Sequence, residues 1–446
     1  MASNRTAPAG SGLPHAAARA TPFVAAAVVV LDCATDFLSD TPLIGVVTPL
    51  RLALAAGLVA LLVTGVRLRT FRTRLDLPIG LLLLASAGTT VVGGHATAPL
   101  RGLLTAVAGY YLIVAVRRSR PESWRAFGLL ALVCVAAVGT TAFAQVTNET
   151  PTGFCRTGLL TEVDCDASGS GTLIRAVGTF ANPNLLAAFL VLFTPVALLA
   201  VGAVAERTAR AVVVLVGVIG YAAVLTTFSR AGYVAAATGL LVLGTAYRLA
   251  PRLDERRRRL AAGLCLAALA AGAVVIWVVS RAGTALGVRG QAWRAALDIA
   301  SADPLGVGLG RAGAVISAAT PGDRVFAHAH NLWLNWLVEA GVAGLSAVLL
   351  ITATALVCAA RAAREKSVVG TAGLAALVGF FLVGMADHPA NLDRVDMLFW
   401  LVLGLVMAEA PDRWRRRAAA PSPATTAAVR SPAAHSERSD STHPAP

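Results

Sequence analysis

The sequence predicts an all-α fold: a polytopic integral membrane protein with about 12 transmembrane helices and a large outer loop before a late helix that carries a histidine. Composition is the first reason, because 57% of the 446 residues are hydrophobic and only 14% are charged, whereas soluble proteins carry roughly 25% charged residues. The second is that apolar runs of about 18 or more residues recur, each long enough to cross a bilayer. The third is that short basic loops separate these runs.

Reading the apolar runs between the basic loops gives twelve spans. They are expected at about 22–38, 42–66, 76–94, 98–116, 124–146, 184–204, 209–228, 231–248, 260–280, 331–358, 367–386 and 396–410. The polytopic membrane domain therefore covers residues 22–410, between a cytoplasmic N-terminal segment at 1–21 and a cytoplasmic tail at 411–446. Asp32 and Asp36 interrupt the first apolar stretch, so we expect an uncleaved first helix. The tail is rich in Ala, Pro, Ser and Thr, which is typical of disorder.

The net charge of +14 reports membrane topology. The basic residues cluster in every second loop: Arg67, Arg69, Arg72, Arg74; Arg117, Arg118, Arg120, Arg125; Arg207, Arg210; Arg252, Arg256 to Arg259; Arg361, Arg364, Lys366; Arg413, Arg415 to Arg417. Basic loops mark the cytoplasmic side, so both termini are expected there and the protein is expected in the cytoplasmic membrane. Membrane lipids are the expected surroundings, and nucleic acid is not an expected partner.

Two loops on the predicted outer side are long, at about 147–183 and 281–330, and long ordered loops are where binding and catalysis tend to reside. The first holds Cys155 and Cys165. A disulfide fits an oxidising compartment, and a zinc pair is the less favoured alternative because no histidine lies nearby. The second contains the amphipathic stretch Gln291–Ala300. A helix on the membrane surface and an ordinary packed helix both remain open for it.

The glycine-rich stretch Gly308-Leu309-Gly310-Arg311-Ala312-Gly313 fits the spacing of a dinucleotide-binding fingerprint. That motif functions only where it joins a strand to a helix, and no strand pattern precedes it here. Tight turns explain these glycines, and no cofactor is expected.

Three arginines, Arg175, Arg230 and Arg289, fall on the predicted outer side, against the bias of the other basic residues. A guanidinium group is always charged and presents a fork of donors that matches phosphate oxygens. Contact with lipid headgroups is the alternative for any one of them. Arg175 precedes Asn182-Pro183, which suits the start of a helix because asparagine caps and proline fits the first turn.

His330 lies where the long outer loop meets a late apolar helix, and a titratable group there calls for a chemical explanation. The helix N-terminus carries partial positive charge, which favours a neutral, proton-accepting imidazole and suits a general base. A purely structural histidine is the alternative. His328, with Asp387 and His388 on another outer loop, offers a metal site as a further alternative, although His-x-His alone is a weak signal.

Two features of the late helix concern its packing. Glu339 lies about 13 Å along the helix from its start, where an intramembrane carboxylate is expected to have a buried pairing or packing role. Ala340 and Gly344 form a small-xxx-small face, which predicts close contact with another helix.

His330-Asn331, nine further residues and then Gly341-Val342-Ala343-Gly344 form a pattern at the outer start of a late helix. In this the chain resembles the O-antigen ligase and polymerase superfamily. Similar further features are the segment from Arg175 to Asn184, Ser229-Arg230, and Arg289 to Trp293 followed by Pro304-Leu305-Gly306-Val307-Gly308. The resemblance covers roughly residues 40–410.

The resemblance implies an inverting, metal-independent glycosyltransferase whose donor is an undecaprenyl-diphosphate-linked glycan and whose acceptor is a glycan, lipid or wall polymer. It implies that Arg175, Arg230 and Arg289 hold the diphosphate and that His330 activates the acceptor hydroxyl. Asn331, His328 and Asp387 are secondary candidates.

Ligation and polymerisation both fit this resemblance. The rival from another class is a secondary transporter or lipid-linked glycan flippase, which should carry charges near the bilayer midplane in two related halves. The charged residues gather at the outer surface instead, and this favours chemistry there.

Overall fold

The computed structural model describes residues 12–38, 42–157, 161–163, 165, 172–245, 288–391 and 393–409. They belong to one compact unit that is mostly helical, as predicted. Eleven of the twelve predicted spans coincide with helices: α1 (Gly12–Thr35), α2 (Pro49–Val63), α3 (Asp76–Val92), α4 (Ala98–Ser119), α5 (Ser123–Thr147), α6 (Pro183–Ala197), α7 (Arg207–Thr226), α8 (Arg230–Gly244), α12 (Leu332–Arg364), α13 (Val368–Gly384) and α14 (Asp393–Glu409). The remaining predicted span, 260–280, lies outside the described residues.

The count of about 12 transmembrane helices is not confirmed. Within the described ranges six helical segments are long and apolar enough to cross a membrane: Ala18–Thr35, Ala98–Ser119, Ser123–Thr147, Pro183–Gly202, Arg207–Thr226 and Leu332–Arg364. Four further apolar helices, α2, α3, α8 and α13, are shorter. These helices indicate a membrane protein.

Capping residues set the helix boundaries. Asn182 accepts hydrogen bonds from the N–H groups of Asn184 and Leu185 at 2.9 and 3.0 Å, and Pro183 follows as the first helical residue, as expected. The second helix is shorter than predicted because Thr48 caps it and Pro49 begins it. Short 3-10 turns occur at η1 (Leu68–Thr70), η2 (Leu198–Gly202) and η4 (Pro389–Asn391).

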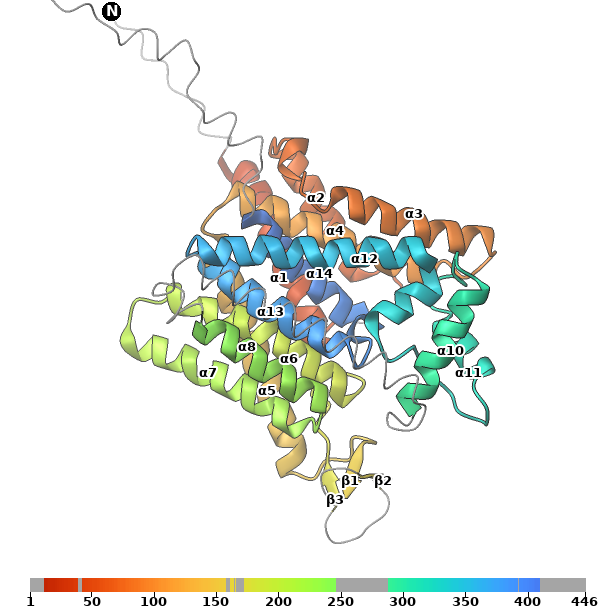
Figure 1. The fold of residues 1–446 in the computed structure, drawn as a ribbon. Coiled ribbons are helices and arrows are strands. Elements are labelled where there is room, and N and C mark those ends of the chain that lie inside the picture. Colours follow the sequence, from red (N-terminus) through yellow and green to blue (C-terminus); the bar gives the residue numbers. More distant parts are fainter. Residues whose placement is uncertain are drawn as a thin grey trace, which may run out of the picture. The chain divides into compact units, whose positions relative to one another are not determined.

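The helix α6 lies at the centre of the packing. All but one of its side chains are buried, and it contacts α5, α7, α8 and α13. A second contact joins α4 to α14, where Tyr110 meets Trp400 edge to face at 6.0 Å between ring centroids. Figure 1 shows α6 among α5, α7, α8 and α13.

The first long loop departs from the all-α prediction, because it forms a small antiparallel sheet in the order β2-β1-β3. Its strands are β1 (Cys155–Thr157), β2 (Thr161–Val163) and β3 (Thr172–Ile174). Cys155 and Cys165 are joined by a disulfide, so the structure favours this pairing over a zinc pair. β3 contacts α5, which precedes the loop.

The second long loop contains the helices α10 (Val288–Ala302) and α11 (Ala312–Ala319). Trp293 and Ala296 of α10 are buried in a small core with Ile316 of α11 and Val338 of α12. The structure therefore favours the packed-helix interpretation of the stretch Gln291–Ala300. In Figure 1 these helices and the three strands lie at the same end of the helical unit.

Candidate functional site

His330 is held in place by its backbone. Asn331 caps α12, and its side-chain oxygen accepts hydrogen bonds from the N–H groups of Trp333 and Leu334 at 3.1 and 3.0 Å. His330 lies one residue before the cap with φ +50°, a conformation that is unfavourable for a side chain with a Cβ and concentrates at functional sites. Its carbonyl accepts a 3.0 Å hydrogen bond from the indole N–H of Trp293.

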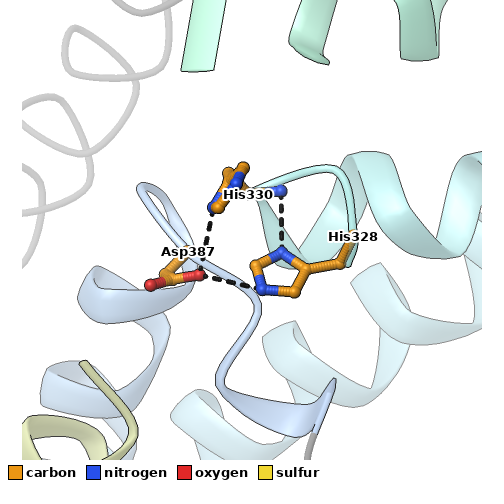
Figure 2. Close-up of side chains that lie close together, drawn as sticks. All are labelled: His328, His330 and Asp387. Atoms are coloured by element: carbon orange, nitrogen blue, oxygen red, sulfur yellow. Dashed lines mark hydrogen bonds and ion pairs between the residues drawn. The ribbon is translucent and has the colours of Figure 1, made fainter. Parts of the chain in front are cut away.

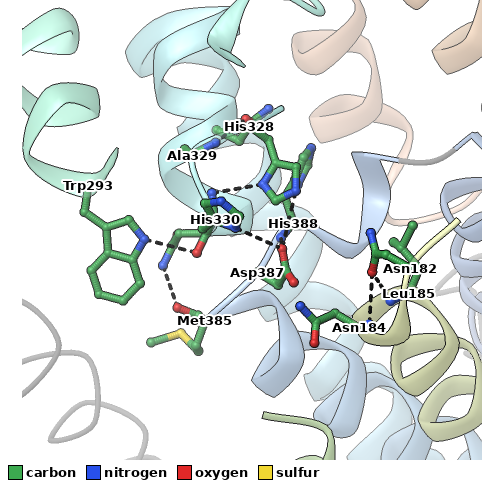
Figure 3. A network of polar contacts seen from close by, with 12 residues as sticks. Asn182, Asn184, Leu185, Trp293, His328, Ala329, His330, Met385, Asp387 and His388 are labelled. Carbon is green, nitrogen blue, oxygen red and sulfur yellow. Dashed lines mark hydrogen bonds and ion pairs between the residues drawn. The ribbon is translucent and has the colours of Figure 1, made fainter. Parts of the chain in front are cut away.

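Asn331 also joins two elements that are distant in sequence. Its side-chain amide donates a 2.9 Å hydrogen bond to the carbonyl of Met385, at the end of α13. Asp387 and His388 follow directly, so this one residue both starts the helix after His330 and brings the next loop beside it. Figure 3 shows this network together with Trp293.

Asp387, His328 and His330 form a compact cluster (Figure 2). Oδ1 of Asp387 lies 3.4 Å from Nε2 of His328 and 3.6 Å from Nδ1 of His330. It also accepts a 2.8 Å hydrogen bond from the backbone N–H of His388. Asp387 and the imidazoles of His328 and His388 are buried, whereas His330 keeps 27% of its side chain exposed. The imidazole that can reach a substrate is that of His330.

The buried histidines His328 and His388 are neutral, and the carboxylate beside them is ionised. Burial lowers the pKa of His328 to about 4, assisted by His330 and Arg289 and opposed by Asp387. Burial likewise lowers the pKa of His388 to about 3. Burial would raise the pKa of Asp387, but the neighbouring imidazoles and the guanidinium group of Arg289 outweigh it and hold this pKa below its usual range.

The contacts indicate where the imidazole protons are expected. The backbone N–H of His330 donates to Nδ1 of His328 at 3.0 Å, so a neutral His328 carries its proton on Nε2, which faces Asp387. Nδ1 of His330 is buried and also faces Asp387. An adjacent carboxylate favours a proton on the nitrogen that faces it, which leaves the other nitrogen as a proton acceptor. The arrangement can therefore abstract a proton through Nε2 of His330.

The same three side chains can in principle hold a metal ion. One ligand atom from each of His328, His330 and Asp387 lies within 4.8 Å of the other two, and two histidines with one carboxylate are common ligands of divalent transition metals. His388, which the sequence offered as a further ligand, is not part of this group.

The glycine pair of the sequence motif marks a break in α12. Gly341 has φ +66° and ψ −164° inside the helix. The segment from Pro304 to Gly308 fills this break: the N–H groups of Val307 and Gly308 donate to the carbonyls of Val338 and Glu339 at 2.9 and 3.0 Å, and the N–H of Val342 donates to the carbonyl of Pro304 at 3.0 Å. A Cβ on Gly341 would lie 2.3 Å from the carbonyl oxygen of Leu305. The break locks the long loop to the helix that follows His330.

The sequence predicted a helix contact at Gly344 and a buried role for Glu339, which lie on either side of this break. Among the described residues, a Cβ placed on Gly344 would lie within 4 Å only of atoms of Ala340 and Trp336 in the same helix, so the structure shows no close contact with another described helix at Gly344. Glu339 precedes the break, and its carboxylate accepts a hydrogen bond from the N–H of Ala312, the first residue of α11, at 3.3 Å. It has a buried partner, as expected, and that partner is a helix N-terminus.

Turns account for two of the three glycines of the fingerprint-like stretch. Gly308 and Gly310 both have positive φ, at +101° and +73°. Gly313 lies inside α11 instead. Within the described residues the stretch joins α10 to α11, two helices. The interpretation of tight turns is confirmed for Gly308 and Gly310.

The three predicted arginines lie in different surroundings. Arg289, on α10, is close enough to act electrostatically on both His328 and Asp387. Arg175 is buried, and it donates from Nε to the carbonyl of Thr227 at 2.9 Å and from a terminal nitrogen to Asn184 at 3.4 Å.

Arg230 is the exposed first residue of α8, which Ser229 caps. Arg289 therefore lies near the histidine cluster. Arg175 is hydrogen-bonded to the turn that precedes Arg230. Asn184 links Arg175 to the start of α6, which packs against η4 just after Asp387. Figure 3 shows Asn184 on the side of the cluster where Asp387 lies.

One further arginine at this site was missed by the sequence reasoning. Arg156, on β1, is buried and donates a 3.1 Å hydrogen bond to the carbonyl of Phe228. Its only sequence signal is a cation next to Cys155 in a loop predicted to be outer.

Comparison with known families agrees with this geometry. Residues 211–349 match the family model described as O-Antigen ligase. This stretch includes Arg230, Arg289, His328, His330 and Gly341, while Arg175 and Asp387 lie outside it. No curated protein matches the chain significantly. The predicted resemblance to the O-antigen ligase superfamily is confirmed, and the match includes α10 with Arg289, α11, the segment with His328 and His330, and the start of α12.

Proposed function

We propose that the protein transfers or polymerises glycan from an undecaprenyl-diphosphate-linked donor onto an acceptor hydroxyl at the outer face of the cytoplasmic membrane. The observation that carries the proposal is the pair of His330 and Asp387. A partly exposed imidazole with one nitrogen facing a buried, ionised carboxylate is the arrangement expected of a general base. The family match to O-antigen ligases supplies the reaction class.

The proposed reaction is a single displacement. The acceptor hydroxyl loses its proton to Nε2 of His330 while its oxygen attacks the anomeric carbon of the donor sugar. The bond from that carbon to the diphosphate oxygen breaks, and the configuration inverts. Asp387 orients the imidazole and stabilises the positive charge that it gains. No step in this scheme requires a metal ion.

The leaving group explains the arginines. A departing lipid diphosphate gains negative charge in the transition state, and guanidinium groups already in place stabilise that charge at low reorganisation cost. Arg289 acts beside the histidine cluster. Arg175 and Arg230 act from the turn between α7 and α8.

Reconstitution tests this proposal. Purified protein in proteoliposomes, given a lipid-diphosphate-linked oligosaccharide and an acceptor, should form a new glycosidic bond, measured by mass spectrometry of the product. His330→Ala should lower the rate by at least about a hundredfold with an unchanged melting temperature. Full activity of that variant would exclude His330 as the base. Donor moved across the membrane without a new bond would instead support a flippase.

The metal-ligand geometry of His328, His330 and Asp387 favours a second mechanism, in which a divalent ion at these residues activates the acceptor. Activity that survives exhaustive chelation supports the metal-independent scheme. Activity that chelation removes and zinc or manganese restores supports the metal-assisted scheme.

A further inference from the structure

The turn between α7 and α8 receives two guanidinium groups from the disulfide-closed loop. Arg175 donates to the carbonyl of Thr227, and Arg156 donates to the carbonyl of the next residue, Phe228. Both side chains are buried, and both act electrostatically on Tyr233 in the first turn of α8. Two like charges are therefore brought to neighbouring atoms of one turn.

Strand pairing explains how the two arginines come together. Arg156 pairs with Leu173 across β1 and β3, and the N–H of Arg175 continues the ladder by donating to the carbonyl of Phe154 at 2.9 Å. Side chains two residues apart share a face of a sheet, so Arg175 is on the same face as Arg156. Cys155 is on the opposite face. The disulfide thus closes the hairpin behind the surface that carries the two cations.

The hydrogen bonds of Arg156 are incomplete. Its Nε is buried and has no hydrogen-bond partner among the described residues. Of the carboxylates whose side chains the structure describes, which do not include Glu162, none lies within ion-pair distance of Arg156. A buried guanidinium with an unsatisfied donor is costly. The nearby N-terminus of α8, with Arg230 at its first position, adds positive potential to the same turn. An anion that bound here would satisfy all of these groups.

We propose that Arg156 is a further anion-binding residue of the protein, which with Arg175 forms a paired guanidinium site for the diphosphate of the donor. The identity of the anion rests on the proposed function, whereas the existence of an anion site does not. Paired forks suit a diphosphate because its oxygens can accept several parallel N–H bonds.

Binding of inorganic pyrophosphate to the purified full-length chain in neutral phosphatidylcholine nanodiscs tests the proposal without turnover. Arg156→Gln should weaken pyrophosphate binding about tenfold or more, as expected for the loss of a charged hydrogen-bond donor. Arg156→Lys, which keeps the charge and loses the fork, should give a smaller loss. Arg324→Gln, at an exposed arginine of the other long loop, is the matched control and should bind pyrophosphate as the unmodified protein does.

Glu162→Gln separates ligand binding from a role inside the hairpin, because Glu162 is the strand partner of Arg156. Equal losses in Arg156→Gln and Glu162→Gln would overturn the proposal, and so would unchanged affinity in Arg156→Gln. If Arg156→Gln does not fold, Arg156→Lys with an unchanged melting temperature carries the test, and unchanged affinity there overturns it.

A last arm distinguishes the sources of phosphate. If phosphatidylglycerol in the nanodisc abolishes pyrophosphate binding at low mole fraction, the site takes headgroup phosphate and the donor assignment is overturned. Weak or no competition supports the diphosphate. Should glycosyl transfer itself never be observed, retained Arg156-dependent binding of pyrophosphate would show that the anion site stands while the proposed function fails.

Discussion

The two long loops build opposite kinds of polar region at one end of the helical unit. The histidine region (His328, His330, Asp387 and Arg289) places the buried, neutral imidazole of His328 and the partly exposed imidazole of His330 beside one ionised carboxylate. The arginine region, which consists of Arg156, Arg175 and the turn 227–230, brings cations to the carbonyls of one turn.

Each loop is also fixed differently. Backbone hydrogen bonds to the break in α12 hold the histidine region, whereas a disulfide and a three-stranded sheet hold the arginine region. Under the proposed function, the histidine region moves a proton and the arginine region holds negative charge. Substitutions in the two regions should therefore have different kinetic effects.

The largest effect is expected from Asp387→Asn. The amide cannot hold His330 in the same tautomer or stabilise its positive charge, so kcat should fall roughly 10³- to 10⁴-fold, as in other carboxylate–histidine pairs. KM for the donor should change little, because the arginine region is intact. Steady-state glycosyl transfer measures this, with the exposed Asp323→Asn as the matched control. A loss of less than tenfold would break the assignment of proton transfer to this region.

The next effect concerns how the histidine region is fixed. Gly341→Ala requires a side chain at φ +66° and places its Cβ against the carbonyl of Leu305, so it should cost about 3 kcal/mol of unfolding free energy and lower activity by more than tenfold. Gly322→Ala is the control, because Gly322 has φ +89° in open space. It should cost only about 1 kcal/mol. Equal melting temperatures of the two variants would contradict the role of the break.

A smaller effect is expected from opening the disulfide. Replacing Cys155 and Cys165 by serine frees a loop whose closure is worth about 2–3 kcal/mol in the chain-entropy model, so the arginine region should be less ordered. KM for the donor should rise a few-fold with kcat nearly unchanged. A reductant should produce the same change in the unmodified protein and no further change in the double variant. A fall in kcat without a rise in KM would show that the two regions are not separable.

The smallest effect is on stability against pH. The folded protein lowers the pKa of His328 to about 4 and that of His388 to about 3, from an ordinary value near 6.5. The unfolded chain therefore binds more protons as pH falls below about 6.5, and stability should decline from there to about pH 4. The lowered pKa of Asp387 adds a further decline below about pH 4.

Melting temperatures between pH 4 and pH 8 measure this decline. His388→Gln should make the melting temperature fall less steeply below pH 6.5, because it removes one of the contributing groups. Near pH 8, where His388 is neutral, the variant should show the same dependence of melting temperature on pH as the unmodified protein. An unchanged slope below pH 6.5 in His388→Gln would contradict the buried, neutral state of His388.

The sequence predicted the helices well because their signal is local. An apolar run reports its own burial, and capping residues such as Asn182 and Asn331 mark helix starts within a few residues. His330 and the family could also be predicted, since spacing along one chain segment carries that information. The helix α10 was predicted from its amphipathic pattern. The sequence could not decide whether its apolar face contacts lipid or protein, because an apolar face packs equally well on either.

The tertiary structure decided how the candidate residues around His330 are arranged. The sequence offered Asp387 only as a secondary candidate or metal ligand, more than fifty residues away, and the packing of α12 on α13 with a hydrogen bond from Asn331 to Met385 places it beside His330. The backbone hydrogen bonds between the segment 304–308 and the break in α12 likewise could not be predicted, because no side-chain pattern encodes them. Arg156 could not be recognised because strand register determines its face. A sequence by itself thus determines which reactive side chains are present and where the helices begin. Their pairing is decided by contacts between distant segments, because burial, charge and hydrogen-bond partners exist only after those segments have packed together.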